Sequence, residues 1–152
     1  MAKQPDPQTD SSKIYHVTIT TDRGTIVMDL DPQLAPTTVN NFVGLARDGY
    51  YDGLTFHRVV PNFVVQGGSP GASEYVGVPR FWRDEIGTEP HTRGAVGLST
   101  RGRDTGDGQI FIDLVDLPRL DHDYTVFARV TAGLDAVDRI VEGTRIESVT
   151  VK

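Results

Sequence analysis

An arginine and a glutamine lie among the hydrophobic residues of the segment 55-TFHRVVPNFVVQGG-68. Most neighbours of Arg58 and Gln66 are β-branched or aromatic residues, which favour a half-buried strand. Charged and amide side chains rarely occupy a core unless they are paired. Because side chains alternate along a strand, Phe56 and Arg58 share a face, and Val64 and Gln66 share a face of the following stretch. Arg58 and Gln66 therefore either face solvent or line a groove that uses a fixed cation and a fixed amide.

A second amide lies next to an aromatic residue in 109-QIFI-112. Gln109 and Phe111 are separated by one residue, so that in a strand they point to the same side. The two segments could together form a small apolar pocket whose rim carries the Arg58 guanidinium and two glutamine amides. The alternative is that Arg58, Gln66 and Gln109 all face solvent on an ordinary sheet, and the residue types alone leave both interpretations open.

The remaining residues argue against other common catalytic and metal-binding sites. The chain contains no cysteine, which excludes disulfides, thiolate metal sites and a cysteine nucleophile. None of its four histidines belongs to an H-E-x-x-H motif. The segment 104-DTGDG-108 lacks the spacing of an EF-hand loop, Ser99 lies outside any G-x-S-x-G motif, and 66-QGGSPG-71 lacks the lysine of a P-loop. We therefore expect no metal ion and no cofactor.

The length and the charge of the chain limit its architecture and its partners. Its 152 residues fit a single domain. The net charge of −6 disfavours nucleic acid and anionic membranes as partners, and no apolar run approaches the roughly 20 residues that span a bilayer. The first residues, MAKQPDPQTDSS, contain no apolar segment typical of a signal peptide. We expect a cytoplasmic protein without membrane insertion, or an exported or periplasmic one if a leader has been removed.

Hydrophobic periodicity predicts a mainly β domain over residues 13–152, preceded by a disordered tail over residues 1–12. Alternating apolar residues predict a hairpin and further short strands, whereas i, i+3, i+4, i+7 spacing predicts two helices. Such strands with one early and one late helix are typical of a barrel or a sandwich with helical caps. The expected strands cover residues 14–20, 25–30, 54–60, 63–66, 95–99, 109–114, 124–130 and 145–151, and the expected helices begin at Pro36 and Leu134 and end before Gly49 and Gly143.

Four segments occur in an order that resembles the cyclophilin family of peptidyl-prolyl cis/trans isomerases: FHRVVPNFVVQGG, GAVGLS, GQIFI and LDHDYTVFARV. The resemblance runs from about Tyr15 to the end of the chain and includes the helix start 35-APTTVNNF-42. It implies a closed eight-stranded antiparallel barrel capped by two α-helices, with the active groove on its outer surface. It also implies a monomeric enzyme without a cofactor, which catalyses rotation about X–Pro bonds and assists protein folding.

The resemblance assigns a catalytic role to Arg58 and a substrate-binding role to a set of residues around it. The implied substrates are proline-containing peptides and unfolded or flexible protein chains. Arg119 stands where many members have tryptophan, and Tyr124 stands where they have histidine. Loss of the indole implies weak binding of cyclosporin-type ligands. The implied substrate-binding residues are Phe63, Val64, Gln66, Ser99, Thr100, Gln109, Phe111, Arg119, Leu120 and Tyr124.

Two other functions are compatible with the same residues. A proline-peptide-binding module with little or no turnover would use the same pocket, and the residues at positions Ser99, Thr100 and Arg119 keep this alternative open. A barrel that binds a small molecule in its lumen would need a cavity among the alternating apolar side chains. Turnover of an Ala-Pro-Phe peptide that depends on Arg58 separates the enzyme from both alternatives.

Overall fold

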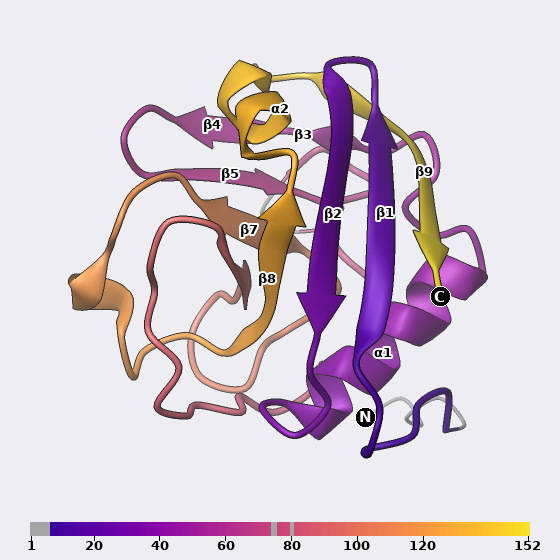
Figure 1. The fold of residues 1–152 in the computed structure, drawn as a ribbon, viewed down its shortest axis with the longest axis vertical. Helices are drawn as coiled ribbons and strands as arrows, with labels where there is room; N and C mark the ends of the chain where they lie inside the picture. The colour runs from indigo at the N-terminus through magenta and orange to yellow at the C-terminus, as the bar shows by residue number, and fades with distance from the viewer. Residues whose placement is uncertain (1–6, 74–75, 80) are drawn as a thin grey trace.

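Residues 7–73, 76–79 and 81–152 are described in a computed structural model of the chain. In these residues nine strands form one antiparallel sheet that curls into a nearly closed barrel (Figure 1). The strand order is β3-β9-β1-β2-β8-β6-β7-β5-β4, and the predicted mainly β barrel is confirmed. The strands are β1 (Tyr15–Thr21), β2 (Gly24–Leu30), β3 (Thr55–Phe56), β4 (Arg58–Val60), β5 (Val64–Gly67), β6 (Ala95–Leu98), β7 (Ile110–Asp113), β8 (Val126–Ala132) and β9 (Thr144–Val151).

The barrel closes through one segment, residues 54–60, which the sequence predicts as a single strand. This segment is broken at His57 into β3 and β4. On one side of the break β3 pairs with β9, and on the other side β4 pairs with β5. Because β3 and β4 stand at opposite ends of the strand order, the segment joins the first edge of the sheet to the last. Counted as one strand, it gives the eight strands of the predicted barrel.

Side-chain alternation along β1 and β2 fills the inside of the barrel. Val17, Ile19, Ile26 and Met28 are at most 1% exposed, and they pair across the hairpin, Val17 with Met28 and Ile19 with Ile26. Complete burial of one such side chain contributes about 1.5–3 kcal/mol. These residues belong to one hydrophobic cluster with side chains from the other strands and from the helices. The space that a small molecule would need in the lumen is therefore occupied by packed side chains.

Helix α1 (Pro36–Arg47) is held at its N-terminus by a residue far along the chain. Pro36 occupies the first turn, where its missing N–H removes no helical hydrogen bond. The Glu85 carboxylate accepts hydrogen bonds from the backbone N–H groups of Thr37 (3.0 Å) and Thr38 (2.6 Å). An anion at this end also interacts favourably with the helix dipole. The irregular segment before β6 is thereby fixed to α1.

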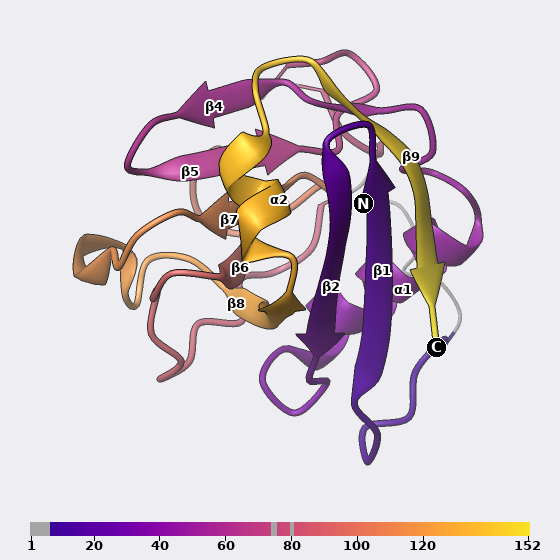
Figure 2. The same cartoon turned by 45° about the horizontal axis from the view of Figure 1, so that its top comes forward.

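Helix α2 (Leu134–Arg139) lies at the other end of the first hairpin from α1, as Figures 1 and 2 show. The sequence predicts that this helix continues to residue 142, and that boundary is wrong. Ile140 already has an extended backbone, with ψ at 129°, and its side chain is 4% exposed. The chain leaves the helix here because it must turn through Gly143, at a φ of 91°, to enter β9.

The predicted tail falls only partly within the described residues, since residues 1–6 lie outside them. Residues 7–12 run beside α1, where Gln8 N donates to Asn40 Oδ1 (2.6 Å) and Arg47 Nη1 donates to the Gln8 carbonyl (2.9 Å). The boundary between tail and domain stays a prediction. Within the described part of the chain, no helix has the length and apolar character that crossing a membrane requires.

Candidate active site

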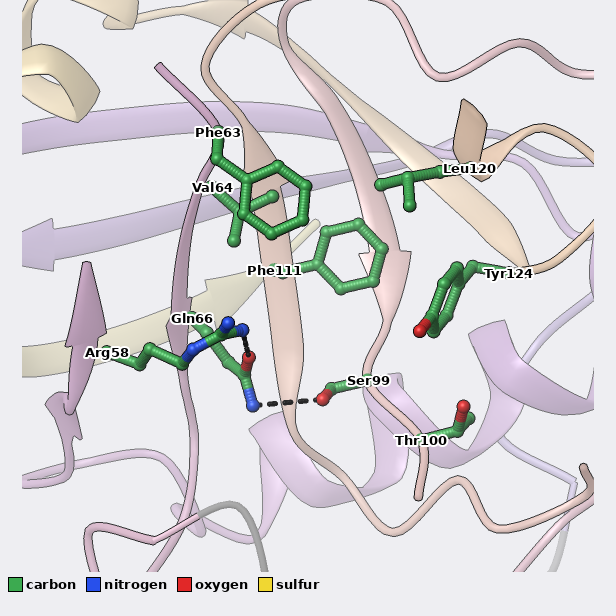
Figure 3. A pocket seen from close by; sticks show the side chains of 9 residues that line it. All are labelled: Arg58, Phe63, Val64, Gln66, Ser99, Thr100, Phe111, Leu120 and Tyr124. Carbon is green, nitrogen blue, oxygen red and sulfur yellow. Dashed lines mark hydrogen bonds between the residues drawn. The ribbon is translucent and has the colours of Figure 1, made fainter. Parts of the chain in front are cut away.

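A hollow of about 250 Å³ opens on the outer surface of the barrel. Strand alternation accounts for its position, because Val65 and Ile112 belong to the interior cluster, whereas their neighbours Val64 and Phe111 belong to a separate cluster outside it. The structure brings together most of the residues to which the resemblance assigns a role. The side chains that line the hollow, drawn in Figure 3, are Arg58, Phe63, Val64, Gln66, Ser99, Thr100, Phe111, Leu120 and Tyr124.

The only cation among these lining residues is Arg58, and its position follows from the sheet register. Arg58 on β4 is the direct partner of Gln66 on β5, and its Nη1 donates a hydrogen bond to Gln66 Oε1 at 3.2 Å. The Arg58 guanidinium carbon lies 6.0 Å from the centre of the Phe63 ring. The arginine is exposed, so that its remaining N–H groups can reach a ligand in the hollow.

A chain of amides holds Gln66 in place behind Arg58. Gln66 Nε2 donates to Ser99 Oγ (2.9 Å) and to Gln109 Oε1 (3.2 Å). Gln109 Nε2 in turn donates to the carbonyls of Ser73 and Val76, each at 3.0 Å. Gln109 precedes β7 and is only 1% exposed. It therefore supports the hollow from behind and does not line it, which differs from the position that the resemblance implies.

The opposite side of the hollow is apolar, as Figure 3 shows for Phe63, Val64, Phe111 and Leu120. The Phe111 ring forms the floor and meets the Tyr124 ring edge-on, with ring centres 5.6 Å apart. The floor fits closely against β6, because a Cβ atom at Gly97 would lie 2.3 Å from Phe111 Cζ. An apolar floor next to a cation and an amide is the pocket that the sequence segments suggest.

Ser99 and Thr100, two of the implied substrate-binding residues, follow directly after β6 and form a further wall of the hollow. Ser99 N donates to the Gln109 carbonyl at 2.9 Å, which fixes the backbone at the point where β6 ends. The Ser99 hydroxyl faces Gln66 (Figure 3), and Thr100 lies farther from Arg58. Tyr124 also lies outside a strand, because β8 begins at Val126 and not at residue 124 as predicted. These side chains are therefore presented by loops that strands hold at one end.

Arg119 lies at the rim and not among the lining residues. It belongs to the short 3₁₀ helix η1 (Pro118–Leu120), which directs Leu120 toward the hollow. The Arg119 guanidinium carbon lies 4.7 Å from the centre of the Phe63 ring. Phe63 therefore has both arginines, Arg58 and Arg119, near its ring, but only Arg58 is bonded to the amide chain.

A buried histidine, His91, lies below the floor, and no sequence pattern assigned it to the site. The His91 ring stacks on the Phe111 ring, with centres 5.8 Å apart and planes at 13°. His91 Nδ1 lies 2.9 Å from Asp113 Oδ2, and neither side chain is exposed to solvent. Burial by itself would lower the pKa of His91, but the hydrogen bond and charge of Asp113, together with the Tyr124 carbonyl and the charge of Asp121, outweigh burial and raise this pKa. No local motif marks His91, because its partner is distant in sequence and its contact arises from the fold.

The described residues contain no group of three histidine, cysteine, aspartate or glutamate side chains arranged to hold a metal ion. The groups that the hollow offers to a ligand are instead a guanidinium, an amide, hydroxyl groups and aromatic faces. Such a site can bind an apolar ring and donate hydrogen bonds to a polar atom attached to it. A proline ring and its amide nitrogen fit this description.

Comparison with known sequences agrees with the resemblance to the cyclophilin family. Residues 16–152 match the family described as cyclophilin type peptidyl-prolyl cis-trans isomerase/CLD. A peptidyl-prolyl cis-trans isomerase of Helicobacter pylori (strain ATCC 700392 / 26695) is 43% identical over 142 residues, which cover 91% of this chain and 87% of that protein. Peptidyl-prolyl cis-trans isomerase B of Bacillus subtilis (strain 168) is 41% identical over 133 residues, covering 86% of this chain and 93% of that protein.

Solved structures share the fold at lower sequence identity. A cyclophilin type peptidyl-prolyl cis-trans isomerase of Cryptosporidium parvum has a TM-score of 0.88 at 24% identity, covering 92% of this chain and 98% of that chain. A second structure of that protein, determined in the presence of the dipeptide Ala-Pro, has a TM-score of 0.86 at 24% identity and covers 90% of this chain and 98% of that chain.

Proposed function

This chain belongs to the family of cyclophilin-type peptidyl-prolyl cis-trans isomerases, and from that premise we propose that Arg58 is its catalytic residue. Enzymes of this family catalyse rotation about X–Pro peptide bonds and thereby assist protein folding. In our proposal the apolar hollow beside Arg58 binds the proline ring. The observation that supports it most directly is the fixed guanidinium at the edge of a pocket of suitable size and polarity.

The reaction needs no nucleophile, because its barrier arises from amide resonance. Rotation about the peptide bond meets a barrier of about 20 kcal/mol, which corresponds to roughly 0.01 events per second. An enzyme that reaches about a thousand events per second must lower this barrier by roughly 7 kcal/mol. Any group that favours the twisted amide over both planar forms contributes to that difference.

Arg58 suits this role because of the charge that develops in the twisted state. When the amide is perpendicular, the prolyl nitrogen becomes pyramidal and gains a lone pair, which a guanidinium N–H can bind. This hydrogen bond is stronger in the twisted state than in either planar state, which is the condition for catalysis. Arginine remains charged and presents several donors in a rigid plane. One of these donors can stay on Gln66 while another reaches the substrate.

The apolar floor increases the effect of that hydrogen bond. Phe111 is 5% exposed and Val64 is 3% exposed, so a proline ring placed on them would displace water from the hollow. A charged donor acts more strongly in a site from which water is excluded, because the local dielectric constant is lower. The same contacts hold the ring while the preceding residue turns.

Gln66 and the segment after β6 are proposed to hold the substrate backbone. Both amide hydrogens of Gln66 already have acceptors, Ser99 Oγ and Gln109 Oε1. A substrate carbonyl can take the hydrogen that now goes to Ser99, because the Ser99 hydroxyl can rotate and bond elsewhere. Anchoring the backbone on one side of the prolyl bond leaves the other side free to rotate.

We further propose that the substrates are proline-containing peptides in unfolded or flexible protein chains, bound by a monomer. The Ala-Pro dipeptide used with the related protein of Cryptosporidium parvum supports a proline dipeptide as the minimal ligand. The net charge of −6 does not favour nucleic acid as a partner, and we propose no membrane insertion. Cyclosporin-type ligands should bind weakly, because Arg119 packs on Phe63 in place of a flat indole.

The test compares two arginines near the same aromatic ring. In a protease-coupled assay on an Ala-Pro-Phe peptide, Arg58→Ala should lower kcat/KM about 100-fold, as removal of a transition-state donor does in other enzymes. Arg119→Ala removes an exposed cation–π contact and should lower it only about two- to fivefold. Equal effects of the two substitutions would show that Arg58 contributes only general positive charge at the rim, and the proposal would be wrong.

A further inference from the structure

We propose that His91 is a positioning residue for the proline pocket, held as an imidazolium by Asp113 so that it fixes the Phe111 floor and the segment that carries Leu120 and Tyr124. The inference rests on the proposed function, since it assigns His91 a role in the same pocket. His91 does not line the hollow and acts through the residues that do.

The arrangement begins with the alternation of β7. Phe111 and Asp113 are two residues apart on this strand, so that their side chains leave the same face. The His91 ring lies over Phe111 with the two planes almost parallel, at 13°, and also contacts the Tyr124 ring edge-on at 6.4 Å between centres. One buried ring therefore touches two of the aromatic walls of the hollow.

The hydrogen bonds of His91 indicate its protonation state. Nδ1 faces Asp113 Oδ2 at 2.9 Å, and Nε2 faces the Tyr124 carbonyl oxygen at 3.3 Å. A carbonyl oxygen and a carboxylate oxygen are both acceptors, so each ring nitrogen makes its bond best when it carries a hydrogen. Only the imidazolium has hydrogens on both nitrogens. Its positive charge then also lies against the face of the Phe111 ring, which attracts cations.

Nearby carboxylates also favour the imidazolium form of His91. Asp113 and Asp121 both act to raise the pKa of His91, against the effect of burial. Burial raises the pKa of Asp113 and Asp121 adds to that effect, whereas His91 and Arg129 act to lower this pKa. The second carboxylate oxygen, Asp113 Oδ1, is buried without a hydrogen-bond partner among the described residues. The carboxylate is therefore held mainly by the imidazolium, and neither partner is stable alone in this position.

The backbone of His91 fixes the other wall of the hollow. Its carbonyl accepts from Leu117 N at 2.7 Å, and its N–H donates to Asp121 Oδ1 at 2.8 Å. These two residues flank η1, which carries Leu120. His91 thus connects the floor to η1 through its main chain and to Tyr124 through its side chain. Because small displacements of a bound substrate from the reactive geometry slow a reaction strongly, loosening these contacts should reduce the effect of Arg58.

The first experiment measures the protonation state in the whole protein. Long-range ¹H–¹⁵N NMR spectra at pH 7 should show hydrogens on both ring nitrogens of His91. A neutral ring with one bare nitrogen would overturn the proposal. This readout does not depend on turnover, so that it stays informative even if Arg58 proves not to be catalytic.

The second experiment separates the charged pair from its packing. The double variant His91→Phe/Asp113→Leu keeps a ring on Phe111 and removes both charges, and such replacements of a buried ion pair are often neutral for stability. We expect kcat to fall about tenfold while the affinity for an Ala-Pro peptide changes little, because the hollow remains but its walls are less well fixed. A folded double variant with the kcat of the wild type would overturn the proposal.

Two further variants serve as a control for the buried double variant and as a substitute for it. The pair His16 and Asp29 makes a similar contact at 2.6 Å on the exposed face of the first hairpin, and His16→Phe/Asp29→Leu should leave kcat unchanged. If the buried double variant does not fold, Asp113→Asn retains the volume and removes the charge. Its kcat should then fall with rising pH at a lower midpoint than in the wild type, and identical pH profiles would contradict the proposal. Arg58→Ala, measured in the same assay, tests the proposed function separately.

Discussion

Arg58 and Gln66 face each other across β4 and β5, and the arginine Nη1 donates to the glutamine Oε1 at 3.2 Å. The pairing of two short strands thus sets the direction of the proposed catalytic group. Gln66 is 3% exposed and is held by Ser99 and Gln109, so that it can serve as a fixed support. The guanidinium itself remains exposed, and this one hydrogen bond defines its orientation toward the hollow.

Gln66→Leu should remove that support while keeping a side chain of similar size. The Arg58 guanidinium would then sample several orientations, and we expect kcat to fall about tenfold, in line with the cost of a misplaced catalytic group. The protease-coupled assay on an Ala-Pro-Phe peptide checks this value. Gln33→Leu changes an exposed glutamine elsewhere and serves as the control. Wild-type turnover in Gln66→Leu would mean that Arg58 needs no support from Gln66.

Gly97 provides a test of the pocket floor. A Cβ atom at this position would lie 2.3 Å from Phe111 Cζ, so that Gly97→Ala must displace the Phe111 ring. Overpacking of this kind costs about 1–3 kcal/mol of stability, and the displaced floor should also lower kcat/KM. Urea unfolding and the peptide assay measure the two effects. Gly87→Ala is the matched control, because an added Cβ at Gly87 would have no described residue within 4 Å apart from its own chain neighbours.

The buried pair also predicts how stability depends on pH. The pKa values of His91 and Asp113 are both raised in the folded protein, so the folded state binds protons more tightly than the unfolded state. The contribution of His91 is complete below its unfolded pKa of about 6.5 and is lost as pH rises through its folded pKa. The free energy of unfolding should therefore decrease over a window that begins near about pH 6.5 and extends upward through the folded pKa of His91.

Urea titrations at several pH values within that window check this prediction. Tyr50 does not interfere, because burial, with a smaller effect of Asp107, raises its pKa to about 12. In His91→Phe/Asp113→Leu the decrease should be smaller than in the wild type. A wild-type curve that is flat or rises over this range would contradict the charged state that we assign to His91.

The sequence was sufficient for the parts of the fold that depend on local patterns. Alternation predicted the first hairpin and the later strands, because each needs one face toward the core. The break at His57 could not be predicted, since it depends on β9 and β5 pairing with the two halves of one segment. Similarly, the apolar spacing of Ile140 and Val141 suggested a longer α2, but the connection to β9 determines where that helix ends.

In the candidate site, too, some residues could be singled out from the sequence, whereas the positions of others depend on the tertiary structure. The strand patterns around Arg58, Gln66 and Phe111 were compatible with a groove and with a solvent-exposed face, and only the resemblance to cyclophilins assigned these residues to a groove. The buried position of Gln109 depends on the carbonyls of Ser73 and Val76, which the fold brings to it. His91 lies in an irregular segment, and its partners come from other parts of the chain. Only the tertiary structure could reveal a residue whose role arises from such distant contacts.

Arg58 is proposed to lower the rotational barrier of a bound prolyl bond, and this role can be measured directly. NMR exchange spectroscopy on an Ala-Pro peptide at saturating protein measures the cis–trans rate on the enzyme directly. For Arg58→Ala we predict a rate about 100-fold below that of the wild type, with peptide affinity changed far less and an unaltered melting temperature, because Arg58 is exposed. A bound peptide that interconverts as fast in Arg58→Ala as in the wild type would contradict the account.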